Sequence, residues 1–158
     1  MDTIFALASA PGKAGISIVR LSGPLAINVA EKLTKSKLKE KQPNLRVIYD
    51  SDNHFIDQAL ILIFRKPYSF TGENVVEFHL HGSSAVVSSV IKLLGNFKGL
   101  RSAEAGEFTR CALDNGKLDL AQVEGLADLI DAETDAQHKQ AARIFNGALG
   151  KKTKEWRA

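Results

Sequence analysis

The sequence lacks most features of secreted, membrane-spanning or disulfide-stabilised proteins. It contains one cysteine among 158 residues, so no disulfide can form within the chain. Its uninterrupted apolar runs, such as residues 59–64, are far shorter than the roughly 20 residues that a membrane-spanning helix needs. No basic N-terminus precedes a short apolar segment, a pattern that would indicate a signal peptide. These absences predict a cytoplasmic protein without a membrane partner.

Surplus charge is also missing from the body of the chain. The formal net charge is +3, yet residues 1–150 hold 17 bases and 17 acids, so the surplus comes from the last eight residues. A nucleic-acid-binding protein usually carries a clustered basic face, which the overall charge does not indicate. One basic cluster exists, and it comprises Lys32, Lys35, Lys37, Lys39, Lys41 and Arg46, interrupted by Glu31 and Glu40. Such a cluster is most typical of a solvated loop, with direct RNA binding as an alternative.

Apolar periodicity and turn residues predict a mixture of strands and helices up to about residue 118. Alternating or β-branched apolar residues predict strands at 3–9, 16–21, 45–49, 56–64 and 74–80, with a short one near Leu100. Helical spacing predicts helices after Ser22-Gly23-Pro24, at 84–95 and within 106–113. The first two strands, and the next two, are expected to form hairpins. The predicted fold class is α+β, with a mixed, largely antiparallel sheet and packed helices.

From Asp119 the pattern is helical almost to the last residue. Asp119 can cap a helix in which Leu120, Val123 and Ile130 repeat at helical spacing. We therefore predict one domain at 1–118 and, at 119–158, the first helical segment of a second domain. This segment is expected to be a helix of roughly 40 residues whose apolar stripe needs packing partners. Those partners are expected in a continuation of the chain or in another chain.

Three charged residues stand where a regular element should be apolar or should begin. Arg20 shares a strand face with Ile16 and Ile18, and Glu77 likewise interrupts an apolar strand. This predicts charges on the apolar side of the sheet, unless the strand end is open. Buried charges need partners, so Arg20 and Glu77 either pair with each other or bind a polar ligand. Lys117 immediately precedes the last predicted helix, where it can reach an anion.

Two histidines are weak candidates for metal ligands. His79 and His81 lie two residues apart on a predicted strand, so their side chains share a face, as two zinc ligands would. Zinc needs a third and usually a fourth ligand, and His54, His138 and Cys111 have no helpful spacing. We therefore predict no metal site, and we predict no catalytic residue.

Several blocks of the sequence together resemble the N-terminal region of the MnmE (TrmE) family of bacterial tRNA-modification GTPases. In the family's order and spacing, the blocks are Asp2-Thr3-Ile4, Pro11-Gly12-Lys13-Ala14-Gly15, Ile18-Val19-Arg20, Ser22-Gly23-Pro24, Ser69-Phe70-Thr71-Gly72-Glu73, Glu77 with His81-Gly82, Gly106-Glu107-Phe108, and Lys117-Leu118-Asp119-Leu120-Ala121-Gln122. Each block alone is a poor signal. Their joint occurrence over most of the chain indicates the family.

The resemblance implies an N-terminal folate-binding domain, similar to that of aminomethyltransferases, which forms a homodimer and binds 5-formyltetrahydrofolate or a related tetrahydrofolate. A helical domain follows, and the family inserts into it a GTPase domain that uses GTP, Mg²⁺ and K⁺. We expect this chain to be truncated before the GTPase domain and not to hydrolyse GTP. In the family, the whole protein works with the flavin-dependent partner MnmG to modify the wobble uridine of tRNA.

The folate contacts that the resemblance implies fall on Arg20, Glu77 and Lys117. A carboxylate such as Glu77 can accept the adjacent N–H donors of a pterin ring, while Arg20 and Lys117 can donate to carbonyl or carboxylate oxygens. Glu104 stands where the family usually has an arginine, which weakens the inference about ligand affinity but not about fold. The alternative function is a module that dimerises and docks MnmG without binding folate.

Overall fold

The computed structural model describes residues 2–147 and divides the chain into two compact units, Met1–Phe108 and the residues from Thr109 onward. Each unit is described by itself. Helix α3 (Glu107–Asp114) begins in the first unit and continues into the second. The basic residues that account for the net charge, 151–158, lie outside the described part. The domain boundary expected between residues 118 and 119 stays a prediction.

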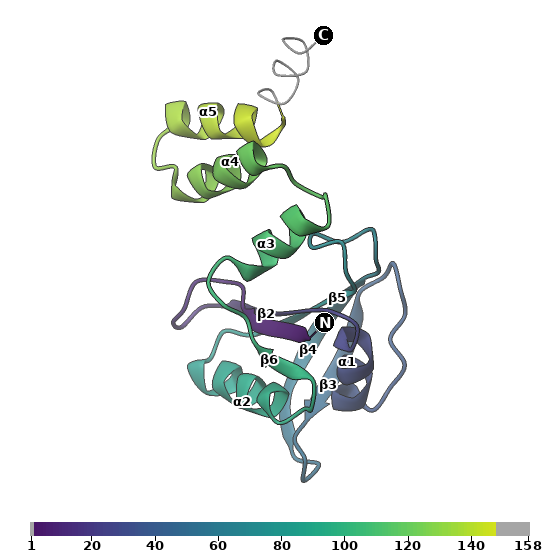
Figure 1. The fold of residues 1–158 in the computed structure, drawn as a ribbon. Helices are drawn as coiled ribbons and strands as arrows, with labels where there is room; N and C mark the ends of the chain where they lie inside the picture. Colours follow the sequence, from purple (N-terminus) through teal and green to yellow (C-terminus); the bar gives the residue numbers. More distant parts are fainter. Residues whose placement is uncertain (1, 148–158) are drawn as a thin grey trace. The chain divides into compact units, whose positions relative to one another are not determined.

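The described part of the first unit contains a six-stranded sheet (Figure 1). In chain order, its strands are β1 (Thr3–Leu7), β2 (Ile16–Ser22), β3 (Asn44–Tyr49), β4 (Phe55–Phe64), β5 (Val75–His81) and β6 (Leu100–Ser102). Their order across the sheet is β3-β4-β5-β2-β1-β6, and the neighbouring strands are antiparallel except for the parallel pair β1 and β6. The predicted α+β fold is confirmed, as are both predicted hairpins.

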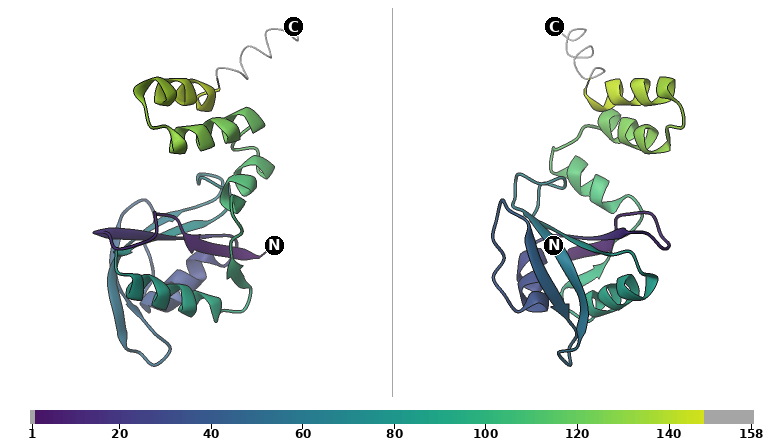
Figure 2. Two further views of the ribbon diagram at one scale, coloured as in Figure 1. Left: turned by 90° about the vertical axis from the view of Figure 1, so that its left-hand side faces the viewer. Right: turned by 180° about the vertical axis from the view of Figure 1, so that it is seen from behind.

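Helices α1 (Ala26–Thr34) and α2 (Ser84–Gly95) cover one face of this sheet (Figure 2). The stripe predicted for α1 is buried, and it comprises Ala26, Val29, Ala30 and Leu33. These side chains belong to the same core as Phe5, Leu21 and Phe78, which are no more than 2% exposed. Removing this apolar surface from water is the main contribution to the stability of the unit.

The other face of the sheet, here named the open face, lies opposite α1 and α2. Along β2, Val19 and Leu21 point into the core, so strand alternation places Ile16, Ile18 and Arg20 on the open face. Ile16 is 61% exposed. Arg20 therefore shares a face with Ile16 and Ile18 as predicted, but this is the face that α1 and α2 leave uncovered. Because β2 is apolar on both faces, its pattern alone does not reveal which face the helices cover.

Gly82, directly after β5, allows the chain to approach the β1–β2 turn closely. The Gly82 carbonyl accepts a hydrogen bond from the Ala14 N–H at 3.0 Å. A Cβ on residue 82 would lie 2.1 Å from the Ala14 carbonyl oxygen, so a side chain cannot fit without moving the backbone. Two blocks that are distant in sequence, 11–15 and 81–82, therefore meet in the fold.

The described part of the second unit holds the end of α3 and two further helices, α4 (Leu120–Asp131) and α5 (Asp135–Phe145). Helix α4 begins as predicted, because the Asp119 carboxylate accepts a hydrogen bond from the Gln122 N–H at 2.8 Å. None of the helices within residues 2–147 has the length and apolar character needed to cross a membrane.

The prediction of one continuous helix from Asp119 was wrong, because Thr134 and Gln137 form a second capping box. The Thr134 hydroxyl accepts a hydrogen bond from the Gln137 N–H at 3.3 Å, and the Gln137 side chain accepts one from the Thr134 N–H at 3.0 Å. Helix α5 then packs on α4, so closely that a Cβ on Gly125 would lie 2.8 Å from the Phe145 nitrogen. Part of the apolar stripe of α4 is thus covered within the chain.

Candidate functional site

Two of the three predicted ligand residues, Arg20 and Glu77, lie side by side on the open face. They stand opposite each other in the register of the antiparallel strands β2 and β5. Arg20 Nε and Nη2 donate to Glu77 Oε1 at 2.9 and 2.8 Å, and the two side chains are 26% and 15% exposed. Mutual pairing was one of the two interpretations of these charges. The pair is shielded from most solvent contact but reachable from the open face.

Two phenylalanine rings lie against the Arg20 guanidinium. Its Cζ is 5.5 Å from the ring centroid of Phe70 and 5.6 Å from that of Phe108. A cation close to an aromatic face is attracted by the π electrons. The two rings and the Glu77 carboxylate therefore hold the guanidinium in position. Neither phenylalanine was predicted to belong to the site. The only signal in the sequence is that both stand in blocks shared with the family.

Phe70 is positioned by a hydrogen-bond network at the end of β2. Ser22 Oγ lies 2.7 Å from Thr71 Oγ1 and donates to Glu73 Oε2 at 2.9 Å. Ser69 Oγ donates to the Glu73 carbonyl at 2.5 Å. Ser22 and Thr71 are fully buried, so these bonds form away from water. The network ties the β4–β5 loop to β2 and thereby fixes a ring beside the guanidinium.

Phe108 is positioned at the start of α3 by a bidentate ion pair. Arg101 Nη1 and Nη2 donate to the two carboxylate oxygens of Glu107 at 2.9 and 2.5 Å. These bonds raise the pKa of Arg101 above its ordinary value, so the guanidinium stays charged. The Glu104 N–H donates to Glu107 at 2.8 Å, and its own side chain is exposed. The residue that departs from the family pattern therefore supports this turn through its backbone.

His79 adds a polar atom without a hydrogen-bond partner beside the ion pair. Its Nε2 is buried and forms no hydrogen bond within residues 2–147, although it lies 3.4 Å from Glu77 Oε2. That separation allows attraction between opposite charges, but the atoms are not aligned for a hydrogen bond, so we regard Nε2 as unsatisfied. Among the described residues, the hydrogen bonds to the Glu77 carboxylate go to Oε1 alone. Its second oxygen is available to accept donors from a ligand.

Lys117, the third predicted residue, belongs to the second unit. It is exposed, and its N–H donates to the Ala112 carbonyl at 2.8 Å, at the end of α3. This bond fixes the backbone just before the cap of α4. The structure thus brings Arg20 and Glu77 together and describes Lys117 within the other unit.

Potential metal ligands gather away from the ion pair. His81 is held by Asp57, with Nδ1 2.7 Å from Oδ1. In the β3–β4 turn, Asp50, Asp52 and His54 each offer one ligand atom, and these atoms lie within 4.8 Å of one another. The Asp50 carboxylate already accepts hydrogen bonds from the N–H groups of Asp52 and His54, at 2.9 and 2.8 Å. This cluster closes the hairpin turn.

The surroundings of the ion pair are apolar and exposed. On the open face, Ile16, Leu60 and Phe64 are 61%, 38% and 37% exposed. A cavity of about 360 Å³ beside the end of β4 is lined by residues that include Phe64 and Arg65, but not by Arg20 or Glu77. The pair therefore lies on a surface patch with an apolar surround.

Comparisons with known proteins agree with one another. The family described as "GTP-binding protein TrmE N-terminus" matches residues 3–117. The chain is 59% identical over 158 residues to the tRNA modification GTPase MnmE of Roseobacter denitrificans, and 56% identical over 158 residues to that of Cereibacter sphaeroides. It is 49% identical over 156 residues to the mitochondrial 5-taurinomethyluridine-[tRNA] synthase subunit GTPB3 of Danio rerio.

These alignments cover almost all of this chain and a minor part of each relative. They include 100% of the chain and 37% of either bacterial protein, and 98% of the chain and 31% of the Danio rerio protein. The chain thus spans about a third of the length of the relatives that it matches.

Proposed function

Because the chain belongs to the TrmE family of tRNA-modification GTPases, we propose that it binds a formylated tetrahydrofolate and forms a homodimer through the open face of its sheet. One observation supports the folate site above others. The Arg20–Glu77 ion pair lies on an exposed apolar sheet face between two phenylalanine rings. A flat heterocycle with adjacent N–H donors matches such a combination of carboxylate, guanidinium and aromatic surface.

Each side chain has a distinct part in the proposed complex. Glu77 uses its available oxygen, Oε2, to accept from a pterin N–H donor while Oε1 stays with Arg20. Arg20 keeps its contact with Glu77 and directs its remaining N–H groups at a carbonyl oxygen of the ligand. His79 Nε2 gains a polar partner on binding, which removes the cost of leaving it unsatisfied. Lys117 donates to the carboxylates of the folate tail.

The proposed homodimer follows from the exposed apolar side chains around the pair. Contiguous apolar surface on a soluble domain marks an interaction site when it is rimmed by polar groups. Ile16 and Leu60 stand on the open face next to the charged centre, on strands β2 and β4. A second copy that covers this face would bury them and exclude water from the folate.

The wider function of the whole protein is carried over as part of the same proposal. This region supplies a folate-bound one-carbon unit to a complex with the flavin-dependent partner MnmG, which modifies the wobble uridine of tRNA. GTP, Mg²⁺ and K⁺ belong to this proposal only for the whole protein.

The alternative is a dimerisation and docking module without folate. One observation favours it: Arg20 and Glu77 already satisfy each other within the chain, so their charges do not require a ligand. Both functions use the open face. They differ in whether removal of the pair abolishes the binding of a small molecule.

Calorimetric titration with 5-formyltetrahydrofolate tests the proposal. The wild type is compared with Arg20→Ala and Glu77→Ala, and all three are first checked for folding by circular dichroism and for dimerisation by sedimentation equilibrium. Each substitution is expected to weaken binding about ten- to a hundredfold, since a charge-assisted hydrogen bond contributes about 1.5–3 kcal/mol.

A second arginine–glutamate pair offers a matched control. Arg65 pairs with Glu40, and their side chains are 52% and 44% exposed. Arg65→Ala removes the same chemical group away from the open face and is expected to leave folate affinity unchanged. If the folded, dimeric wild type does not bind folate, the proposed folate site is excluded and the alternative, a dimerisation and docking module, is favoured. A folded wild type that remains monomeric would reject the proposed dimer.

A further inference from the structure

A basic patch without acidic partners lies at the end of α1 and along the loop to β3. Residues 31–46 contain six bases and two acids. Both acids are already paired, Glu31 with Lys37 at 2.7 Å and Glu40 with Arg65. Within the described residues, the other five bases of this segment form no ion pair, and they are Lys32, Lys35, Lys39, Lys41 and Arg46. We name these five residues the basic patch.

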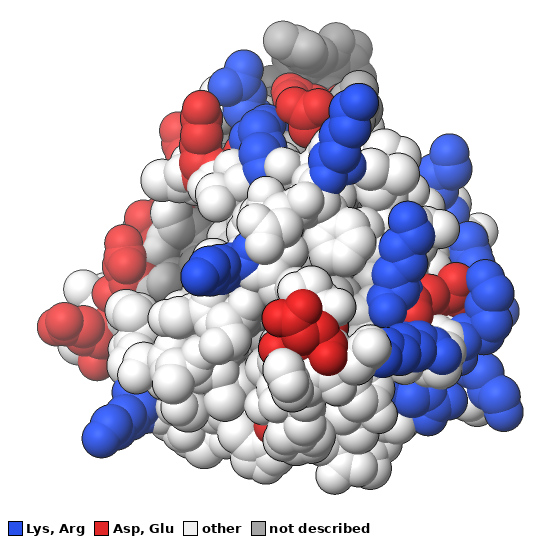
Figure 3. Space-filling model, turned by 90° about the horizontal axis from the view of Figure 1, so that it is seen from below, with Lys and Arg blue, Asp and Glu red and all other residues white. Residues whose placement is uncertain are grey.

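The patch occupies one side of the first unit. Seen from below in Figure 3, acidic side chains lie near the middle of this face, and Lys and Arg side chains gather to the right, where α1 lies in Figure 1. The four lysines of the patch are exposed and Arg46 is half-buried. Five positive charges held without acidic partners attract a polyanion, in contrast to the balanced charge of residues 1–150 taken together.

Two of these lysines stand where glycine would fit the backbone with less strain. Lys35 and Lys41 have φ angles of +48° and +59°, in the left-handed region. Lys35 ends α1 at the position where helices usually have glycine. Lysine at such positions is a local cost to stability. Within the chain, the Lys35 ammonium donates to Asn53 Oδ1 and lies over the Tyr49 ring, which offsets part of this cost.

An aromatic cavity adjoins the patch. It has a volume of about 270 Å³, and its walls come from the ends of α1 and α2 and from the β3–β4 turn. Tyr49 and Phe97 line it together with Lys32, Lys35 and Asn96. Lys35 Nζ lies 4.5 Å from the centroid of the Tyr49 ring. The volume falls just below the roughly 300–1,000 Å³ typical of sites for drug-sized ligands, so a smaller aromatic group suits it.

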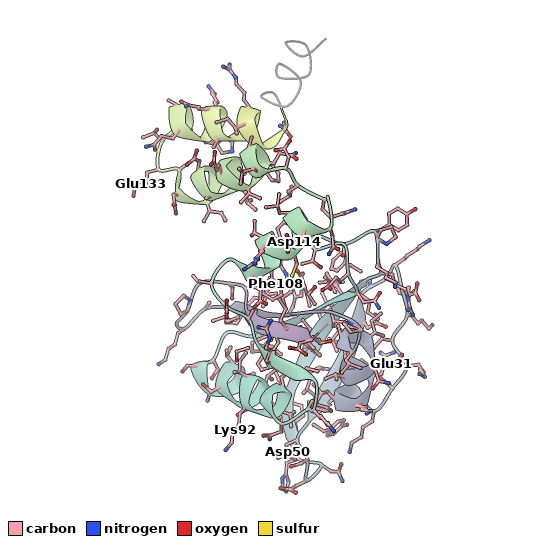
Figure 4. All side chains as sticks on the ribbon, in the orientation of Figure 1. Glu31, Asp50, Lys92, Phe108, Asp114 and Glu133 are labelled. Atoms are coloured by element: carbon pink, nitrogen blue, oxygen red, sulfur yellow. The ribbon has the colours of Figure 1, made fainter. Side chains whose placement is uncertain are left out.

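The rim of the cavity also offers hydrogen-bond acceptors. Asp50 lines it at the β3–β4 turn, below α1 and α2 in the view of Figure 4. Hydrogen bonds from the N–H groups of His54 and Asp52 lower the pKa of Asp50, so its carboxylate stays ionised. An ionised carboxylate repels phosphate but accepts the amino or imino protons of a nucleobase. The cavity is therefore suited to a base, and the lysines beside it to a phosphate.

We propose that the basic patch and this cavity bind a single-stranded segment of RNA, with phosphates on the lysines and one unstacked base between Tyr49 and Phe97. Unstacked bases on aromatic side chains and backbone phosphates on lysines are the usual contacts of single-stranded RNA with proteins. This surface is distinct from the Arg20–Glu77 site. A negative result for RNA binding therefore does not affect the proposed folate site, and a negative result for folate does not affect the proposed RNA site.

Fluorescence anisotropy with fluorescein-labelled tRNA tests the phosphate contacts. The wild type is expected to bind with an affinity that falls as salt rises, and Lys32→Glu/Lys35→Glu is expected to abolish most of that binding. Where residual binding is measurable, the slope of log affinity against log salt becomes shallower by about 1.4, about 0.7 for each phosphate that the variant no longer neutralises. Lys13→Glu in the β1–β2 turn is the matched control, because this turn lies on the opposite side of the unit from α1 (Figure 1).

Two gentler variants separate recognition from folding. Lys35→Gly relieves the left-handed position, so thermal stability is retained or raised while tRNA affinity falls. Tyr49→Leu keeps an apolar side chain but removes the aromatic face, and it is expected to weaken tRNA binding about five- to a hundredfold. The same Tyr49→Leu variant should bind heparin, a polyanion without bases, as the wild type does.

Several outcomes would overturn the proposal. Affinity for tRNA that does not change with salt would exclude phosphate contacts. Equal losses of tRNA affinity for Lys13→Glu and for Lys32→Glu/Lys35→Glu would show that tRNA is attracted by the charge of the protein as a whole and is not bound at the basic patch. Binding to phosphatidylglycerol vesicles in the absence of tRNA binding would assign the patch to an anionic membrane surface.

Discussion

Leu21 and Phe78 are fully buried beneath α1 and α2, whereas Arg20 and Glu77, one residue earlier on the same two strands, form a partly exposed ion pair on the open face. The two faces share a backbone, and strand alternation decides which strand side chains lie on each. One face carries the apolar surface that stabilises the fold. The other carries charge, two aromatic rings and a histidine nitrogen without a hydrogen-bond partner among the described residues.

This division has a physical consequence for substitutions. A side chain removed from the helix-covered face leaves a cavity in a close-packed core. A side chain removed from the open face leaves a gap that water can fill. Stability and ligand recognition are therefore expected to respond to different sets of residues, even where those residues are neighbours in sequence.

The largest expected effect comes from Phe78→Ala on the helix-covered face. Phe78 is 0% exposed, so its loss is expected to lower the free energy of unfolding by about 3–5 kcal/mol. Leu60→Ala on the open face, where Leu60 is 38% exposed, is the matched change and is expected to cost about 1 kcal/mol or less. Urea unfolding followed by circular dichroism measures both. Similar losses for the two variants would mean that the open face is as tightly packed as the core.

The two hairpins could be predicted from the sequence, but the pairing of β2 with β5 and the assignment of faces could not. Alternation located β2 and β5 and placed Arg20 and Glu77 on strands. It failed to identify the covered face, because Ile16 and Ile18 are as apolar as Val19 and Leu21. The placement of α1 and α2 determines which face is buried, and that placement depends on contacts between residues far apart in the chain.

The remaining differences have local causes that the sequence partly contains. The break before α5 is encoded by Thr134 and Gln137, a capping box that the apolar periodicity obscured. The rings of Phe70 and Phe108 stand 50 and 88 residues after Arg20, so no local pattern predicts their contact with it. They reach it only because the β4–β5 loop and the start of α3 are each tied down by their own hydrogen bonds.

An intermediate effect is expected from the ion pair, which sharpens the comparison. Arg20→Met and Glu77→Leu should each lower the free energy of unfolding by about 1–3 kcal/mol, because each leaves a charged partner unpaired. This is below the roughly 3–5 kcal/mol of a fully buried pair, since both side chains contact solvent. The double variant should cost less than the sum of the two, and urea unfolding of the full cycle measures this coupling. Additive losses would show that the pair contributes nothing beyond its separate side chains.

The smallest expected effect is the most informative about the open face. His79→Leu removes a buried nitrogen without a hydrogen bond, so thermal unfolding should show stability unchanged or raised by up to about 1 kcal/mol. His138→Leu, at an exposed histidine of α5, serves as the control for the loss of an imidazole. A clear loss of stability in His79→Leu would mean that Nε2 interacts favourably with Glu77 Oε2 across 3.4 Å. Arg20, Glu77 and His79 would then form a stabilising charge cluster. In that case the open face would also contribute to the stability of the fold, and His79 Nε2 would no longer be evidence for a bound ligand.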